Sequence, residues 1–178
     1  MTIPPENLDA PAGSARSQAG DAGRLLAAEM QNLDKHERRF GYCVCGTGFV
    51  VPQGVQSEVV SNPVIHPLPW VTPCLRGMFN QRGNAVPVFD LSPLFDHEPE
   101  EKACAYMLIT DSGERAAGLV VDGLPVVLTC EPSEMPQLDS LPPLIAHTVQ
   151  ATYSAAGQNW YEVDHQALFR SITQKVLD

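Results

Sequence analysis

Short apolar runs alternate with clusters of Gly, Pro, Asn and Asp from residue 40 onward, and this alternation restricts the possible folds more than any other feature of the chain. The runs are typical of β-strands, and the clusters between them are typical of turns. Many short strands separated by turns predict an all-β barrel or sandwich. The predicted strands are residues 40–45, 49–51, 55–60, 75–79, 85–91, 104–110, 117–121, 126–130, 144–153 and 160–163.

Both ends of the chain depart from this strand pattern. Residues 1–23 are mostly Pro, Ala, Gly and Ser, and they carry too little apolar surface to offset the entropy of ordering, so we predict a disordered tail. Residues 24–39 and 165–177 each carry apolar side chains on one stripe at helical spacing, which predicts a helix in each segment. The whole pattern is that of an all-β domain, or of two small subdomains sharing one core, with terminal helices.

The charge balance narrows the classes of partner. A net charge of −10 disfavours binding to a nucleic-acid backbone or to an anionic lipid surface, because both are negatively charged. No apolar run approaches the roughly 18 to 20 residues that a membrane-spanning helix needs, and no basic segment followed by an apolar one marks a secretory signal. We therefore expect a cytoplasmic protein whose partners are neither nucleic acids nor membrane lipids.

The cysteines do not form a recognisable metal-binding pattern. Cys43 and Cys45 stand two apart, whereas Cys74, Cys104 and Cys130 stand alone, and no His lies at a spacing that would complete a ligand set. An odd number of cysteines without an export signal indicates reduced thiols. We expect these residues to be buried as small apolar side chains, with no metal and no cofactor.

The segment 75–91, LRGMFNQRGNAVPVFDL, reads as a β-hairpin. Its two apolar runs are joined by a polar turn in which Gly83 and Asn84 can supply the positive φ angles of a tight turn. Arg82 lies in the turn and Arg76 in the strand before it, and both guanidinium groups suit carboxylates or interfaces. A simpler interpretation is that Arg82 is only a solvated polar residue on a turn.

The hairpin also carries a family resemblance. GMFNQRG at residues 77–83, followed by PVFDL at 87–91, resembles the central motif of the CheW-like coupling proteins of bacterial chemosensory systems. The end of the chain, around residues 160–169, is most similar to the PilI-like branch that serves type IV pilus (twitching) systems. Further matches occur in the family's order at residues 40–52, 55–60, 68–69 and 119–124.

The resemblance implies a fold of two five-stranded, SH3-like β-barrels packed together, with helical pieces at the ends. The CheW-like domain would span residues 40–177, with a first barrel at about 40–95 and a second barrel at about 102–164. Some strand exchange between the barrels is expected at their ends.

The resemblance also implies a non-catalytic adaptor for chemotaxis or twitching motility. Such an adaptor binds the regulatory domain of a CheA-type histidine kinase and the cytoplasmic tip of a methyl-accepting chemoreceptor, in arrays near the inner membrane. Asp90 and Asp122 match family positions, and we expect both to cap turns. The residues that the resemblance assigns to receptor or kinase binding are Glu58, Arg76, Asn80, Arg82, Gly83, Val86 and Val88.

An enzyme is the alternative, and its best case is Asp111-Ser112-Gly113. An apolar run followed by Asp-Ser-Gly resembles the loop of homodimeric aspartic proteases, in which two carboxylates share one proton. Glu114 and Arg115 follow where those proteases have small apolar residues, and Asp-Ser-Gly is also a common turn between strands. No Gly-x-Ser-x-Gly motif supports serine hydrolase chemistry. The adaptor is therefore the favoured hypothesis.

Overall fold

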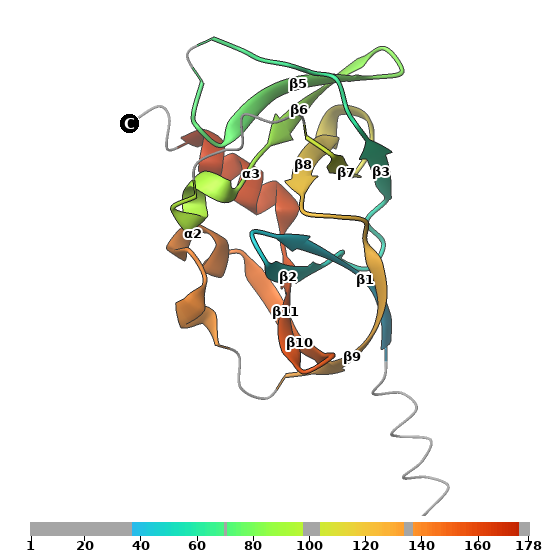
Figure 1. The fold of residues 1–178 in the computed structure, drawn as a ribbon, viewed down its shortest axis with the longest axis vertical. Helices are drawn as coiled ribbons and strands as arrows, with labels where there is room; N and C mark the ends of the chain where they lie inside the picture. Colours follow the sequence, from blue (N-terminus) through green and yellow to red (C-terminus); the bar gives the residue numbers. More distant parts are fainter. Residues whose placement is uncertain (1–36, 70, 98–103, 134–136, 175–178) are drawn as a thin grey trace, which may run out of the picture. The chain divides into compact units, whose positions relative to one another are not determined.

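In the computed structural model, which describes residues 37–69, 71–97, 104–133 and 137–174, the strands form two sheets (Figure 1). One sheet is a closed five-stranded barrel with the order β1-β2-β11-β10-β9, and the other has six strands with the order β3-β7-β8-β6-β5-β4. The barrel consists of β1 (Glu37–Val44), β2 (Thr47–Val50), β9 (Val126–Pro132), β10 (Val149–Ala155) and β11 (Gln158–Val163). The six-stranded sheet consists of β3 (Ser57–Ser61), β4 (Ile65–His66), β5 (Leu75–Gln81), β6 (Asn84–Phe89), β7 (Tyr106–Thr110) and β8 (Ala117–Val121).

The predicted division into barrels at residues 40–95 and 102–164 is wrong. The closed barrel joins the first two strands of the described chain to the last three, and the six-stranded sheet is built from the strands between them. Two pairings connect these groups of strands: β1 pairs with β9 in antiparallel orientation, and β2 pairs with β11 in parallel, with Phe49 opposite Tyr161. Pairing between segments so far apart in the chain leaves no local pattern in the sequence, so the exchange was underestimated.

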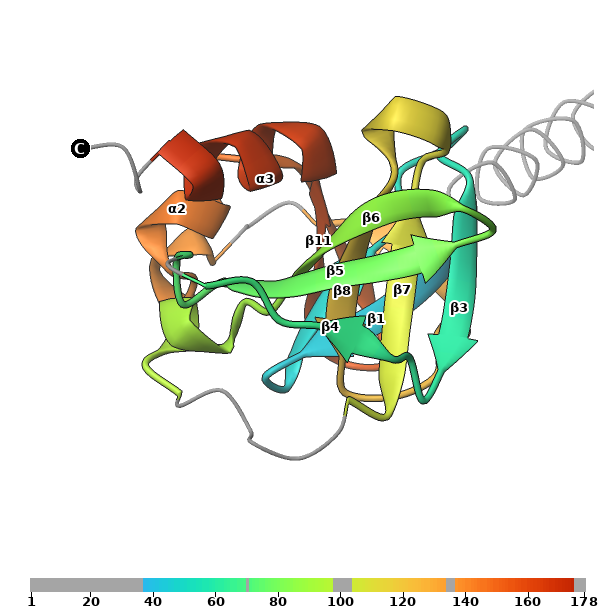
Figure 2. The ribbon, with the colours of Figure 1, turned by 90° about the horizontal axis from the view of Figure 1, so that it is seen from above.

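The six-stranded sheet differs from the predicted five strands mainly through one bend. β3 and β4 occupy its two edges, yet only residues 62–64 separate them in the chain (Figure 2). Asn62, with φ of 49°, turns the chain between the two edges. β3 and β4 therefore act as one bent strand, and counted in that way the sheet has the five strands that were expected.

Three apolar clusters form the core, and the largest of them joins the two sheets. One fills the barrel and includes Trp160, and a second lies within the six-stranded sheet and includes Met107. The largest contains residues from both sheets and from α3 (His165–Gln174), including the Phe89 and Phe169 rings, which stack with centroids 4.4 Å apart. Because this core is shared, neither sheet buries all of its apolar surface without the other.

In two segments the secondary structure differs from the sequence prediction. The predicted helix at 24–39 ends in residues that belong to β1, while the rest of that segment and the predicted tail lie outside the described residues. The predicted strand at 144–153 begins instead with α2 (Pro143–Ala146), and β10 starts at Val149. Proline is favoured at the first position of a helix, and this short helix places Ile145 in the core with no exposed area. The C-terminal helix is confirmed as α3, and the residues after Gln174 are not described.

Asp122 fastens the two sheets at the β1–β2 turn, as expected of a turn-capping carboxylate. Its two carboxylate oxygens accept the backbone N–H groups of Cys45 at 3.0 Å and Gly46 at 2.8 Å. Its own N–H donates to the carbonyl of Cys43 at 2.9 Å. Since Asp122 directly follows β8, these bonds connect the end of the six-stranded sheet to the barrel.

Gly77 of the family motif is required by the path of β5. The register shifts between Leu75 and Gly77, and Gly77 has φ of +145°, which side-chain-bearing residues rarely adopt. A Cβ there would overlap the carbonyl oxygen of His66. We expect Gly77→Ala to lower the free energy of unfolding by about 2 kcal/mol, measured by denaturant unfolding, because backbone strain of about 1–3 kcal/mol adds to the overlap.

Gly54→Ala is the matched control for Gly77→Ala. Gly54 also has a positive φ, of +77°, but no atom lies within 4 Å of an added Cβ. This variant should lose only the strain, about 1 kcal/mol. Equal losses in the two variants would show that the overlap with His66 contributes nothing.

Candidate partner-binding site

The tip of the β5–β6 hairpin is a two-residue turn formed by Arg82 and Gly83. Gln81 pairs with Asn84, and the two residues between them have φ of 51° and 90°. Positive φ at both positions matches the tight turn whose twist suits a hairpin. The prediction that Gly83 supplies a positive φ to the turn is confirmed, but the other residue with a positive φ is Arg82 rather than Asn84. Asn80 stabilises the turn, since its Oδ1 accepts the Gly83 N–H at 2.8 Å.

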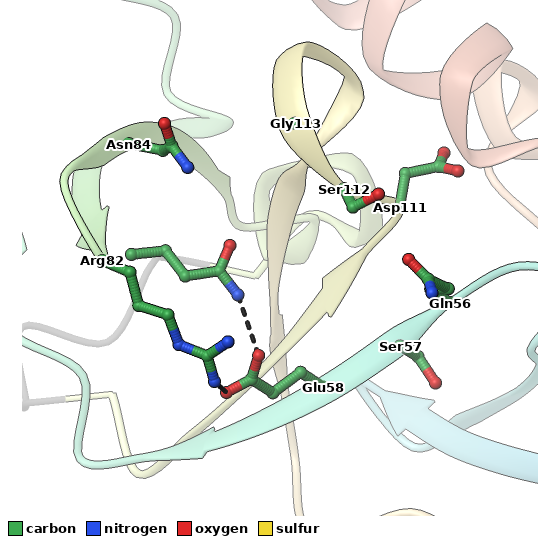
Figure 3. A pocket seen from close by; sticks show the side chains of 9 residues that line it. Gln56, Ser57, Glu58, Arg82, Asn84, Asp111, Ser112 and Gly113 are labelled. Carbon is green, nitrogen blue, oxygen red and sulfur yellow. Dashed lines mark hydrogen bonds and ion pairs between the residues drawn. The ribbon is translucent and has the colours of Figure 1, made fainter.

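The turn brings Arg82 to Glu58 on β3. The Arg82 side chain is 84% exposed, and its Nη2 lies 3.7 Å from Oε1 of Glu58, which is 48% exposed (Figure 3). Gln81 donates from Nε2 to the other carboxylate oxygen of Glu58 at 2.9 Å. Glu58, which was proposed from a separate segment of the sequence, therefore lies beside the motif residues Asn80, Arg82 and Gly83. Gln81 also belongs there, and its position beside Arg82 in the motif was the available signal.

Arg76 does not join this group. Its Nη1 lies 2.8 Å from Oδ2 of Asp90, and the two side chains are only 20% and 7% exposed. Asp90 also accepts the N–H of Ser92 at 3.0 Å, so it caps the turn after β6 as expected. Arg76 thus stabilises the base of the hairpin and is not an exposed cation at its tip.

The structure also removes Val86 and Val88 from the contact surface. They are 1% and 0% exposed and lie in the core of the six-stranded sheet. Side chains along a strand point alternately to its two faces, so Val86 and Val88 lie on the same face of β6. That face is buried, which is why the prediction that these valines contact a partner is wrong. The sequence identified them as strand residues but could not say which face is covered.

A polar pocket lies between the hairpin tip and the β7–β8 loop. Its volume is about 290 Å³, and it is lined by residues 56–58, by Gln81, Arg82 and Asn84 of the hairpin, and by residues 111–113 of the loop (Figure 3). The loop was predicted as a possible protease motif, and it is a turn that connects β7 to β8. The family motif and this loop, distant in sequence, therefore form two walls of one pocket.

Asp111 is held in a structural role at the rim of this pocket. Its carboxylate accepts a hydrogen bond from Nε2 of Gln166 on α3 at 3.0 Å and lies 3.6 Å from Nη2 of Arg115. Gln166 also donates to the carbonyl of Arg115 at 2.8 Å. Figure 3 shows the Asp111 carboxylate directed away from Arg82 and Glu58. These contacts attach the loop to α3 and give no support to the protease alternative.

The cysteines behave as packing residues. Cys74, Cys104 and Cys130 are buried as expected, and Cys43 and Cys45 are half-buried. Burial, with the charge of Asp122, raises the pKa of both half-buried thiols, that of Cys45 to about 11, so they stay protonated at neutral pH. In the described part of the chain, no three His, Cys, Asp or Glu side chains are placed to hold a metal ion.

Two groups of large apolar side chains are exposed. One group lies in β3 and in the connection that contains β4, and the other lies on β1, on β9 and just before β9. The first group is Val59, Val64, Leu68 and Val71, and the second is Phe40, Leu124, Val126 and Val127.

Among the described residues, no helix is long and apolar enough to cross a membrane.

Comparison with known proteins identifies the family. No curated protein matches the chain. Among solved structures, the scaffolding protein TtCheW from Thermoanaerobacter tengcongensis shares the fold, with a TM-score of 0.61 and 18% sequence identity, over 75% of this chain and 88% of that one. A family model described as the CheW-like domain matches residues 41–173, which include the hairpin, the pocket, the whole six-stranded sheet and the barrel except for the start of β1. The chain therefore belongs to the CheW-like domain family.

Proposed function

We propose that this protein is a non-catalytic adaptor of a bacterial chemosensory system, which couples the cytoplasmic tip of a chemoreceptor to the regulatory domain of a CheA-type histidine kinase. The observation that supports this most is the family match over residues 41–173, combined with the exposure of Arg82 at the tip of the family's own motif. An adaptor of this kind would work in the cytoplasm, in arrays near the inner membrane.

The two partners would use different surfaces. A receptor tip is a helical coiled coil with exposed Glu and Gln side chains, which suit the polar hairpin tip at Arg82 and Glu58. The kinase regulatory domain would cover apolar surface, and the exposed group that includes Val59 and Val64 offers it. Affinity would then come mainly from apolar burial, while the charged hairpin sets the register of the complex.

The pathway is either chemotaxis or pilus-based twitching motility. The similarity to the PilI-like branch favours twitching, although Trp160, Tyr161, Leu168 and Phe169 in that segment are buried and serve packing here. Deleting the gene tests the two pathways directly. Loss of twitching with normal swimming would assign the protein to the pilus system, and the reverse would assign it to flagellar chemotaxis.

Charge reversal at the hairpin tests the receptor contact. We expect Arg82→Glu to weaken co-sedimentation with receptor-containing membranes about tenfold, because a favourable charge becomes a repulsive one. Binding to the isolated kinase regulatory domain should persist, and the melting temperature should change little, since Arg82 is exposed.

Arg170→Glu provides the matched control. Arg170 is an exposed arginine on α3 that does not line the pocket at the hairpin tip, and its replacement changes the net charge by the same amount. The control variant should bind receptors like the wild type. Unchanged receptor co-sedimentation of Arg82→Glu would exclude a receptor contact at Arg82. Failure of the wild-type chain to bind either partner would overturn the adaptor function itself.

A further inference from the structure

We propose that the pocket between the hairpin tip and the β7–β8 loop binds a carboxamide side chain, Gln or Asn, presented by the partner. This inference rests on the proposed adaptor function, because it names the chemical group that the receptor-facing site would recognise. It is carried by the geometry of Arg82 and Glu58, by the neutral lining around them and by the size of the pocket.

Arg82 and Glu58 both line the pocket, and neither side chain has its hydrogen-bonding capacity filled. Their closest atoms are 3.7 Å apart, whereas a charge-assisted N–H···O bond is about 2.7–2.9 Å long. Among the described residues, this long ion pair is the contact that the Arg82 guanidinium makes, and Gln81 occupies only one of the two Glu58 oxygens. A strong donor and a strong acceptor therefore stand side by side.

A carboxamide is complementary to this arrangement. Its oxygen can accept from Arg82 while its NH₂ group donates to Glu58, so both charges are satisfied at once. A carboxylate would be attracted by Arg82 but repelled by Glu58, and the net charge of −10 adds to the repulsion. An ammonium group would be attracted by Glu58 but repelled by Arg82. Only a group with both a donor and an acceptor gains from the whole ion pair.

The remaining lining agrees with a neutral ligand. Gln56, Ser57, Asn84 and Ser112 contribute uncharged polar groups, and the Asp111 carboxylate is directed toward α3 instead (Figure 3). The volume of about 290 Å³ lies just below the usual range of about 300–1,000 Å³ for small-molecule sites. The pocket therefore suits one side chain of a protein partner better than a free metabolite.

Both walls of the pocket are held in place. The Asn80–Gly83 hydrogen bond fixes the hairpin tip, and the Asp111–Gln166 hydrogen bond fixes the loop to α3. α3 in turn is anchored by Leu168 and Ile172, which are 1% and 2% exposed. A pocket with fixed walls loses less conformational entropy on binding, which favours recognition of a single group.

The proposal is tested by replacing each charged residue of the pair with glutamine and measuring whether the affinity for the receptor rises or falls. The full-length chain would be titrated with a soluble receptor cytoplasmic fragment, as wild type, Glu58→Gln and Arg82→Gln. A carboxamide ligand loses one charge-assisted hydrogen bond in each variant, so both should bind about tenfold more weakly. Tighter binding by Glu58→Gln would reveal a carboxylate ligand, tighter binding by Arg82→Gln a cation, and either result would overturn the proposal. Arg170→Gln is the control and should be neutral.

A second measurement does not depend on the adaptor function. In NMR titrations of the wild-type chain with the capped amino acids N-acetyl-glutamine amide, N-acetyl-glutamate amide and N-acetyl-lysine amide, only the glutamine compound should shift the signals of Arg82 and Ser112 in a saturable way. Shifts by a charged compound instead, or by none, would overturn the proposal. If the receptor fragment fails to bind but the glutamine compound does, the proposed function fails while the pocket assignment stands.

Discussion

Arg39→Met is expected to lower the free energy of unfolding by about 3 to 5 kcal/mol, because it leaves a buried carboxylate without its counter-charge. The Arg39 side chain is 9% exposed, and its Nη1 lies 3.1 Å from Oε2 of Glu162, which is 14% exposed. Its Nη2 donates to the Tyr153 hydroxyl at 2.8 Å, and that hydroxyl donates to Glu162 at 3.1 Å. The cluster joins β1, β10 and β11 of the barrel, so its loss should appear as a lower denaturant midpoint.

Two further variants separate charge from packing. Arg39→Met/Glu162→Gln removes both charges and keeps a hydrogen-bond partner for Tyr153, so it should recover most of the lost stability. Arg38→Met replaces the neighbouring exposed arginine and should change the free energy of unfolding by less than about 0.5 kcal/mol. A double variant no more stable than Arg39→Met would show that the buried charge is not the cause.

Acid should destabilise the protein through His165. Its side chain is buried at the start of α3, where its Nε2 is hydrogen-bonded to the Tyr42 hydroxyl at 2.6 Å. Burial lowers the pKa of His165 from 6.5 to about 4, although the charges of Asp111 and Asp164 partly oppose the change. Among the described residues, Nδ1 has no hydrogen-bond partner, so an imidazolium would place an unsatisfied N–H in the core.

The direction of the pH effect follows from proton uptake. Between pH 6.5 and 4 the unfolded chain binds a proton at His165 and the folded chain does not, so stability falls as the pH decreases. The free energy of unfolding should therefore be highest above pH 6.5 and should decline by about 3 kcal/mol toward pH 4, measured by urea unfolding at several pH values.

His165→Gln should flatten this pH dependence, because glutamine can still bond to the Tyr42 hydroxyl but does not titrate in this range. The comparison is cleanest between pH 6.5 and 5, before most carboxylates protonate. His147→Gln replaces an exposed histidine and should keep the wild-type slope. Equal slopes for His165→Gln and the wild type would assign the acid sensitivity to other groups.

Local chemistry was enough to predict the elements near the hairpin. Alternating apolar residues and a Gly-containing turn predicted β5 and β6, although the strands end elsewhere than predicted and the turn is formed by Arg82 and Gly83 alone. Asp90 and Asp122 were expected to cap turns because a carboxylate after a strand readily accepts nearby N–H groups, and both do so. These features depend on residues close together in the chain.

The site was predictable only in part. Arg82 was proposed from the hairpin motif and Glu58 from the match at residues 55–60, but neither indicated that Gln81 would bind Glu58 or that the β7–β8 loop would form the opposite wall. The same motif wrongly included Val86 and Val88, whose exposure depends on what covers β6. The buried pair of Tyr42 and His165 was not predicted either, since its members come from opposite ends of the domain.

The amino-acid sequence by itself determined that this chain forms short strands with tight turns, which segments end in caps, and which family it resembles, because propensity, alternation and turn chemistry act between near neighbours. Only the tertiary structure decided that β2 joins β11, that α3 completes the shared core, and that two distant loops enclose one polar pocket. The reason is physical: a residue's burial and partners are set by surfaces that meet only after the chain has closed on itself.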